Sequence, residues 1–286
     1  FEIGGWYVGE MAPILMRGRV DSDLLDPENW TFASPLSFRD ALPDAAGRPA
    51  IDYFGVPFFE APYPAGAFVG GGDAAGGDAA GGGPSRRYCA PMGWLETNVV
   101  RFRDPDHLWH DPSGRTFHLW MRAHTGGTGY ACVAKAVEEE PGAGPIATRL
   151  ETVPSGRRAL YVPCPGGQMK FHVIYDEPSE RFWLLSTQAT DSMRRPDRLP
   201  ANRYNLPNNE RRRLQLHFSR NMIDWCFAGL VAVGPTEVAS RHYAAMAVRG
   251  DDLLIVSRSG DEESVNPHDT NLSTFHVVRR FRELVY

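Results

Sequence analysis

Short apolar runs separated by tight turns dominate the C-terminal part of the chain. Three runs of strand length follow one another there, at 243–248, 253–257 and 272–278. A turn at Gly250-Asp251 separates the first two runs, and glycine supplies the positive φ that a two-residue hairpin turn requires. A polar loop precedes the third run, and charged and aromatic side chains gather where the runs begin and end. This pattern predicts an antiparallel meander.

The same order of strands recurs twice upstream. Residues 170–233 read as strand, turn, strand, long polar loop, strand, turn and strand, with the turns at 176–180 and 221–224. Residues 94–140 supply three more strands, and 148–153 is a possible fourth. Four-stranded repeats of roughly 60–75 residues are typical of propeller blades. The sequence therefore predicts an all-β fold, a β-propeller built from four-stranded antiparallel blades.

The N-terminal part is less regular. Residues 1–15 are expected to form one or two strands, and 21–38 an acidic turn that leads into an outer strand at 30–34. Several prolines interrupt 39–93, so we expect an irregular insertion there, with a flexible Gly/Ala-rich loop at 67–84. Three blades and about half of another fall short of the roughly four that closure takes. We therefore expect residues 1–286 to be a single, incomplete propeller domain whose N-terminal blades are missing from the sequence.

Composition narrows the range of partners. Hydrophobic residues make up 42% of the chain and charged residues 23%, as in ordinary soluble proteins. A net charge of −5 argues against nucleic-acid binding, and no apolar run approaches the roughly 18 residues of a membrane span. The four cysteines have no paired spacing, so buried free thiols are expected. No cofactor is expected, although a structural or catalytic divalent cation stays open.

Candidate chemistry lies at the strand ends, because the loops at one end of a propeller form its pocket. Polar groups there are costly to bury unless they are paired or face a ligand. Alternative interpretations stay open for several residues. Glu96 could form an ordinary ion pair, His118 and His217 could be core residues, and His107 and His110 could belong to an exposed loop. Trp94, Trp109 and Trp120 could pack in the core. The candidates are Glu96, Asn98, Arg122, His124, Lys170, His172, Gln188, Arg241, His242, Tyr243, Arg258, His268 and Asn271.

Several stretches resemble the bacterial sialidase-like propeller proteins, known as BNR-repeat or exo-sialidase-like. These stretches are 21–30, 94–100, 240–244, 251–260 and 268–276. Sialidases clamp the substrate carboxylate with three arginines and use a glutamate-activated tyrosine as nucleophile, with an aspartate as acid/base. The resemblance implies Arg122, Arg241 and Arg258 as the clamp and Tyr243 with Glu96 as the nucleophilic pair. The early arginine motif of sialidases has no counterpart here, and 219–225 is a degenerate form of their Asp-box turn.

A second resemblance is to propeller polysaccharide lyases, including those that split rhamnose from glucuronate by β-elimination. It implies that Arg241 neutralises the uronate carboxylate and that His242 or Tyr243 removes the C5 proton, with His124 or His172 as alternative bases. On a regular strand, Arg241 and Tyr243 would share one face while His242 pointed away.

We expect an enzyme that hydrolyses a terminal glycosidic bond in an acidic glycan containing sialic or uronic acid. The expected partner is an acidic oligosaccharide or polysaccharide, and the family resemblance implies a secreted or periplasmic location. Eliminative cleavage and a non-catalytic glycan-binding propeller are the alternatives.

Overall fold

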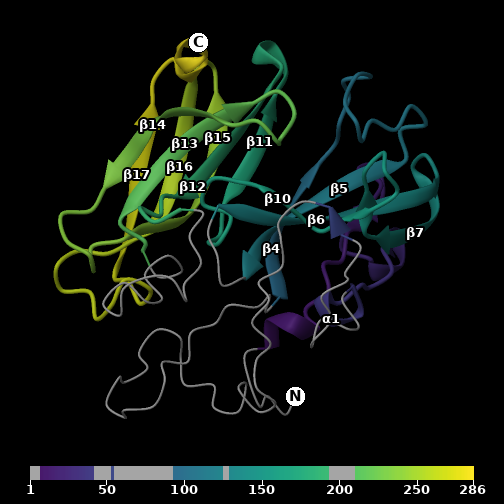
Figure 1. Cartoon of the computed structure of the whole chain (residues 1–286), viewed down its shortest axis with the longest axis horizontal. Helices are drawn as coiled ribbons and strands as arrows, with labels where there is room; N and C mark the ends of the chain where they lie inside the picture. The colour runs from purple at the N-terminus through teal and green to yellow at the C-terminus, as the bar shows by residue number, and fades with distance from the viewer. Residues whose placement is uncertain (1–6, 42–52, 55–92, 125–128, 193–209) are drawn as a thin grey trace.

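A computed structural model describes residues 7–41, 53–54, 93–124, 129–192 and 210–286 (Figure 1). The predicted flexible loop at 67–84, most of the predicted insertion at 39–93, and Cys89 lie outside the described residues. The described chain is all-β apart from short helical turns, which confirms the predicted fold class.

The first large sheet contains the predicted upstream unit. Its fourth strand begins at Ala143 rather than at 148 as predicted, because a tight turn with Gly142 at φ 73° folds the chain straight back. A short strand, β10, pairs with the other end of β6. The strands are β4 (Gly93–Val100), β5 (Thr116–His124), β6 (Tyr130–Glu140), β7 (Ala143–Arg149) and β10 (Tyr161–Pro163).

The second and third sheets follow in chain order, each as an antiparallel meander. The second matches its prediction strand for strand. The third has three strands in the described residues instead of the four of a complete blade, and the chain continues into the 3-10 turn η6 (Phe281–Leu284). The strands are β11 (His172–Asp176), β12 (Arg181–Thr187), β13 (Arg213–Ser219), β14 (Cys226–Val233), β15 (Arg241–Arg249), β16 (Asp252–Ser259) and β17 (Leu272–Val278).

Residues 7–15 cover the first sheet and form no strand, and residues 1–6, on which part of the strand prediction falls, lie outside the described residues. The carbonyl of Met11 accepts hydrogen bonds from Trp94 Nε1 at 2.7 Å and from the Phe38 backbone N–H, and the side chains of Met11 and Leu15 pack on the core beneath. The strand predicted at 30–34 is present and shorter. The elements are η1 (Tyr7–Glu10), β1 (Met16–Gly18), η2 (Pro27–Asn29), β2 (Trp30–Phe32) and α1 (Phe38–Ala41).

A small sheet joins distant parts of the chain at the edge of the first large sheet. Its strands are β3 (Tyr53–Phe54), β8 (Glu151–Thr152) and β9 (Arg158–Ala159), in the order β3-β9-β8.

The three large sheets pack face to face, as propeller blades do (Figure 1). Trp120 and Val133 of the first sheet pack with Leu184 of the second, and Trp183 on the opposite face of the second sheet packs with Ile255 of the third. Each fully buried side chain of this size contributes about 1.5–3 kcal/mol. The first strands β4, β11 and β15 lie side by side as a result.

Several simple interpretations of the sequence are confirmed. Cys132, Cys164 and Cys226 are free thiols. His118 is buried and bonded to Glu151, His217 is buried within β13, and Trp94, Trp109 and Trp120 lie in the core. His107 and His110 lie in a loop as expected, but they are half-buried rather than exposed and bond to the carbonyls of Asn221 and Phe102.

Candidate functional site

The first strands of the three large sheets, β4, β11 and β15, are connected by hydrogen bonds from side chains. No backbone-to-backbone pairing of β-strands joins these three, all of which lie within the described residues. Asn98 of β4 donates to the carbonyl of Phe171 (3.2 Å) and accepts from the N–H of Val173 (3.0 Å), so it is level with His172. Lys170 Nζ donates to the carbonyl of Ala244 (2.9 Å) and His172 Nδ1 accepts from the N–H of Met246 (3.1 Å). These two bonds place His172 level with Ala245.

Three polar residues therefore occupy equivalent positions on the three sheets. Asn98, His172 and Ala245 lie level with one another on the three sheets. Glu96 stands two residues before Asn98, Lys170 two before His172 and Tyr243 two before Ala245. The fold brings a carboxylate, an amine and a phenol from distant parts of the sequence to one end of the first strands.

Glu96 and Tyr243 both lie in β-bulges. The register with the neighbouring strand shifts between Leu95 and Asn98 in β4, and between His242 and Ala245 in β15. Their φ angles are 59° and 47°, values that bulky residues rarely adopt and that cost about 1–3 kcal/mol. A bulge re-aims the side chain that it carries.

The bulge at Tyr243 overturns the regular alternation expected for β15. His242 does not point away from Tyr243, because the two rings are in edge-to-face contact with centroids 4.9 Å apart. Arg241 donates from Nη1 to the carbonyls of Ser240 (2.7 Å) and Gly260 (2.8 Å), which fastens the strand end.

Arg122 is the central residue of this group of side chains. It is buried, and its Nε donates to the carbonyl of Gln168 at 2.7 Å. Its Nη1 lies 3.4 Å from the Tyr243 hydroxyl and 3.5 Å from Glu96 Oε2. One guanidinium thus contacts both bulge residues.

Arg211, which the sequence analysis missed, is the second buried arginine of this cluster. Its Nη1 donates to His242 Nδ1 at 2.8 Å, and its guanidinium carbon lies 5.5 Å from the centre of the Tyr243 ring. Burial, together with the nearby charge of Arg122, lowers the pKa of Arg211 to about 10. The sequence signal was a run of three arginines at the start of β13, of which Arg212 and Arg213 form ion pairs with Glu237 and Glu210.

Residues from the third sheet complete the surroundings of Tyr243. The guanidinium carbon of Arg258 lies 5.6 Å from the ring centre, and Arg258 is held by Thr270 Oγ1 and the carbonyl of His268. The ring of His268 is 6.2 Å from that of Tyr243.

Three other candidates have structural contacts or lie apart. Asn271 bonds to Ser264 and Asp261 within its own loop, and the Gln188 backbone N–H pairs with Arg213. The backbone of His124 pairs with Gly93, and its side chain lies outside the described atoms.

His242 is neutral. Burial, and then the charges of Arg211 and Arg258, lower its pKa to about 2. Because Nδ1 accepts from Arg211, the proton is on Nε2. Within the described part of the chain, His242 Nε2, Arg211 Nε and Glu96 Oε2 are buried without a hydrogen-bond partner. These three atoms are available to bond to a ligand or to water.

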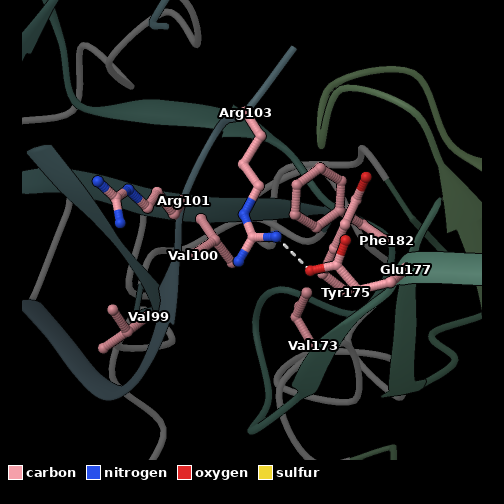
Figure 2. A pocket seen from close by; sticks show the side chains of 8 residues that line it. All are labelled: Val99, Val100, Arg101, Arg103, Val173, Tyr175, Glu177 and Phe182. Carbon is pink, nitrogen blue, oxygen red and sulfur yellow. Dashed lines mark hydrogen bonds and ion pairs between the residues drawn. The ribbon is translucent and has the colours of Figure 1, made fainter. Parts of the chain in front are cut away.

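A separate pocket of about 240 Å³ lies at the opposite ends of β4 and β11 (Figure 2). Val99, Val173 and Phe182 line it, and an ion pair between Arg103 and Glu177 crosses it. It shares no residue with the group of side chains around Tyr243, called the Tyr243 cluster. This cluster consists of Glu96, Arg122, Arg211, His242, Tyr243 and Arg258. The described residues contain no group of three or more His, Cys, Asp or Glu side chains that could hold a metal ion.

No protein-family model matches the sequence, and no curated protein sequence matches it. Among solved structures, a mutant Trypanosoma rangeli sialidase displaying trans-sialidase activity is similar over 67% of this chain and 24% of its own, with 13% identity and a TM-score of 0.36. The leech intramolecular trans-sialidase is similar over 65% of this chain and 24% of its own (15% identity, TM-score 0.34). The Penicillium chrysogenum alpha-L-arabinanase is similar over 63% of this chain and 44% of its own (7% identity, TM-score 0.31).

The chain spans about a quarter of the length of these sialidase chains. None of the helices in the described ranges is long and apolar enough to cross a membrane.

Proposed function

We propose that the Tyr243 cluster binds the carboxylate of an acidic sugar and hydrolyses its glycosidic bond, with Tyr243 as nucleophile and Glu96 as its base. One observation carries the proposal: Arg122 Nη1 lies within 3.5 Å of both the Tyr243 hydroxyl and Glu96 Oε2, beside the second buried arginine, Arg211. Planar guanidinium groups match a carboxylate with two parallel hydrogen bonds.

The chemistry proceeds in two displacements. Glu96 accepts the phenolic proton while Tyr243 Oη bonds to the anomeric carbon and the bond from that carbon to the glycosidic oxygen breaks. The leaving oxygen keeps the electron pair and takes a proton from an acid outside the pair. Water then bonds to the anomeric carbon and loses a proton to the base left by that acid. The bond to Tyr243 breaks, and the phenolate recovers its proton from Glu96.

Arg122 and Arg211 contribute positive charge that attracts the carboxylate of the substrate. Both are buried, so their attraction for a substrate carboxylate is screened less than at an exposed surface. Arg258, beside the Tyr243 ring, adds positive charge where the phenolate forms.

An aryl sialoside tests the nucleophilic pair without the leaving-group acid, because a phenolate leaves without being protonated. We expect release of the aryl group, and a fluorinated sialic acid should label Tyr243 covalently, as detected by peptide mass spectrometry. Tyr243→Phe and Glu96→Gln should each lower the rate by at least about 100-fold. Tyr175→Phe, which removes a phenol at the other end of β11, is the matched control and should keep full rate.

Other outcomes would replace this proposal. A product from a uronic-acid polymer that absorbs in the ultraviolet would indicate β-elimination. Binding of an acidic glycan without turnover or labelling would indicate a glycan-binding protein. A secreted or periplasmic location accompanies the proposal, since such glycans lie outside the cytoplasm, and is tested by fractionating the source cells.

A further inference from the structure

We propose that Lys170 is the positioning residue of this site, and that its ammonium group fixes the bulge that carries Tyr243 beside Glu96. The inference rests on the proposed function and adds to it a residue from the segment that leads into β11 of the second sheet.

The position of Lys170 in the fold is the first argument. It occupies on β11's sheet the place that Glu96 occupies on the first sheet and Tyr243 on the third. The lateral bonds of Asn98 and His172 set all three positions level. Lys170 therefore belongs to the sheet between those that carry Glu96 and Tyr243.

The contact with the bulge is the second argument. Lys170 Nζ donates to the carbonyl of Ala244 at 2.9 Å, and Ala244 directly follows Tyr243 within the bulge. Ala244 is buried, and a buried carbonyl displaced from the regular ladder needs a donor. Lys170 supplies that donor from the neighbouring sheet. Its bond therefore helps to hold Tyr243 at its strained φ for as long as the two sheets stay packed together.

Charge is the third argument. Burial lowers the pKa of Lys170 from its ordinary 10.5, and the carboxylate of Glu96 opposes this shift. The same attraction links the Lys170 ammonium to the carboxylate of Glu96, the group proposed to accept the phenolic proton.

The choice of residue type supports a specific role. The chain has 30 basic residues, of which Lys135 and Lys170 are its two lysines. A compact ammonium donates to one backbone carbonyl, whereas a third planar guanidinium would compete with Arg122 and Arg211 for a substrate carboxylate. Lys135 is accounted for by its ion pair with the buried Glu151 at 2.8 Å.

The first experiment compares Lys170→Met with Lys170→Arg in turnover of the aryl sialoside. Lys170→Met should lower kcat at least about 30-fold with KM changed less than about threefold, because the bulge that carries Tyr243 loses its donor. Lys170→Arg keeps a charged donor and should recover part of kcat. Wild-type kcat in Lys170→Met, or equal losses in the two variants, would overturn the inference.

The second experiment needs no turnover. Lysine labelled with ¹³C at Cε gives two side-chain signals in this chain, and the one lost in Lys170→Arg belongs to Lys170. That signal should titrate below pH 10.5, and Glu96→Gln should move its titration lower still, because the opposing carboxylate is gone.

An unchanged Lys170 titration in Glu96→Gln would overturn the inference even if the enzyme is active. An inactive and unlabelled wild-type protein would instead overturn the proposed function, and the titration would still decide on Lys170. If Lys170→Met fails to fold, Lys170→Arg and the titration keep both tests in force.

Discussion

Arg211 donates a hydrogen bond to Nδ1 of His242 across 2.8 Å, and both side chains are buried. This bond joins the second sheet to the third directly behind Tyr243. It fixes the tautomer of His242 and one end of the Arg211 guanidinium, so the remaining N–H groups of Arg211 keep a defined direction.

Replacing His242 should therefore loosen Arg211. His242→Leu leaves a buried guanidinium N–H without its acceptor and should lower the free energy of unfolding by about 1–3 kcal/mol. It should also weaken binding of an acidic sugar about tenfold, measured by calorimetry. His242→Asn is the matched control, because its side-chain oxygen stands near the position of Nδ1 and should retain more of both properties. Equal losses in the two variants would show that this bond does not orient Arg211.

Stability should fall in mild acid because two buried histidines resist protonation. Burial lowers the pKa of His217 to about 4, and burial with neighbouring arginines lowers that of His242 to about 2, from 6.5. Below pH 6.5 the unfolded chain therefore binds protons that the folded chain does not. Each histidine should reduce the free energy of unfolding by up to about 1.4 kcal/mol per pH unit, until its folded pKa is reached.

Urea unfolding between about pH 7 and about pH 5 checks this slope, in a window where the unfolded histidines gain their protons. His217→Phe keeps the ring beside Phe227 and removes the titrating group, so its slope should be shallower than that of the wild type. Parallel slopes in the two proteins would show that His217 does not carry the effect.

The C-terminal turn is fastened to the second sheet by one arginine. Arg282 donates through Nε (2.8 Å) and Nη2 (2.7 Å) to the two oxygens of the buried Asp176, and through Nη1 to Asp251 (2.9 Å). Arg282→Met should cost about 3 kcal/mol, because it leaves the Asp176 carboxylate buried and unpaired. The neighbouring Arg280→Met, which removes an exposed pair with Glu283, should cost less than about 1 kcal/mol. Urea midpoints measure both variants.

The strands could be predicted from the sequence because their cause is local. Alternating apolar residues and turn residues such as Gly250 specify strand length and direction without reference to the rest of the chain. The start of β7 at Ala143 was not predicted, because a two-residue turn moves it. The three strands of the third sheet match the three predicted runs, although this unit was counted as a complete blade.

The candidate site was predicted in part. Glu96, Arg122 and Tyr243 stand at strand ends, where sequence patterns place a propeller pocket, and the structure brings them together. Arg211 was missed because three consecutive arginines look alike until the packing buries one of them. The bulges were also missed, since a positive φ at a glutamate or tyrosine is imposed by neighbouring sheets and leaves no local signal.

Gly167 should be indispensable to the site because the segment around it holds Arg122 in place. The carbonyl of Gly167 accepts from the Ala123 N–H at 2.9 Å, and the next carbonyl, that of Gln168, accepts from Arg122. A Cβ at Gly167 would lie 2.1 Å from the carbonyl oxygen of Tyr130, so the backbone must shift.

Gly167→Ala should therefore cost about 3 kcal/mol in urea unfolding, and it should lower both labelling of Tyr243 and sugar binding. Gly156→Ala is the control, because its added Cβ meets nothing within 4 Å and only its φ of 82° is strained. It should cost about 1–2 kcal/mol and leave the site intact. Normal sugar binding in a folded Gly167→Ala variant would show that this segment does not position Arg122.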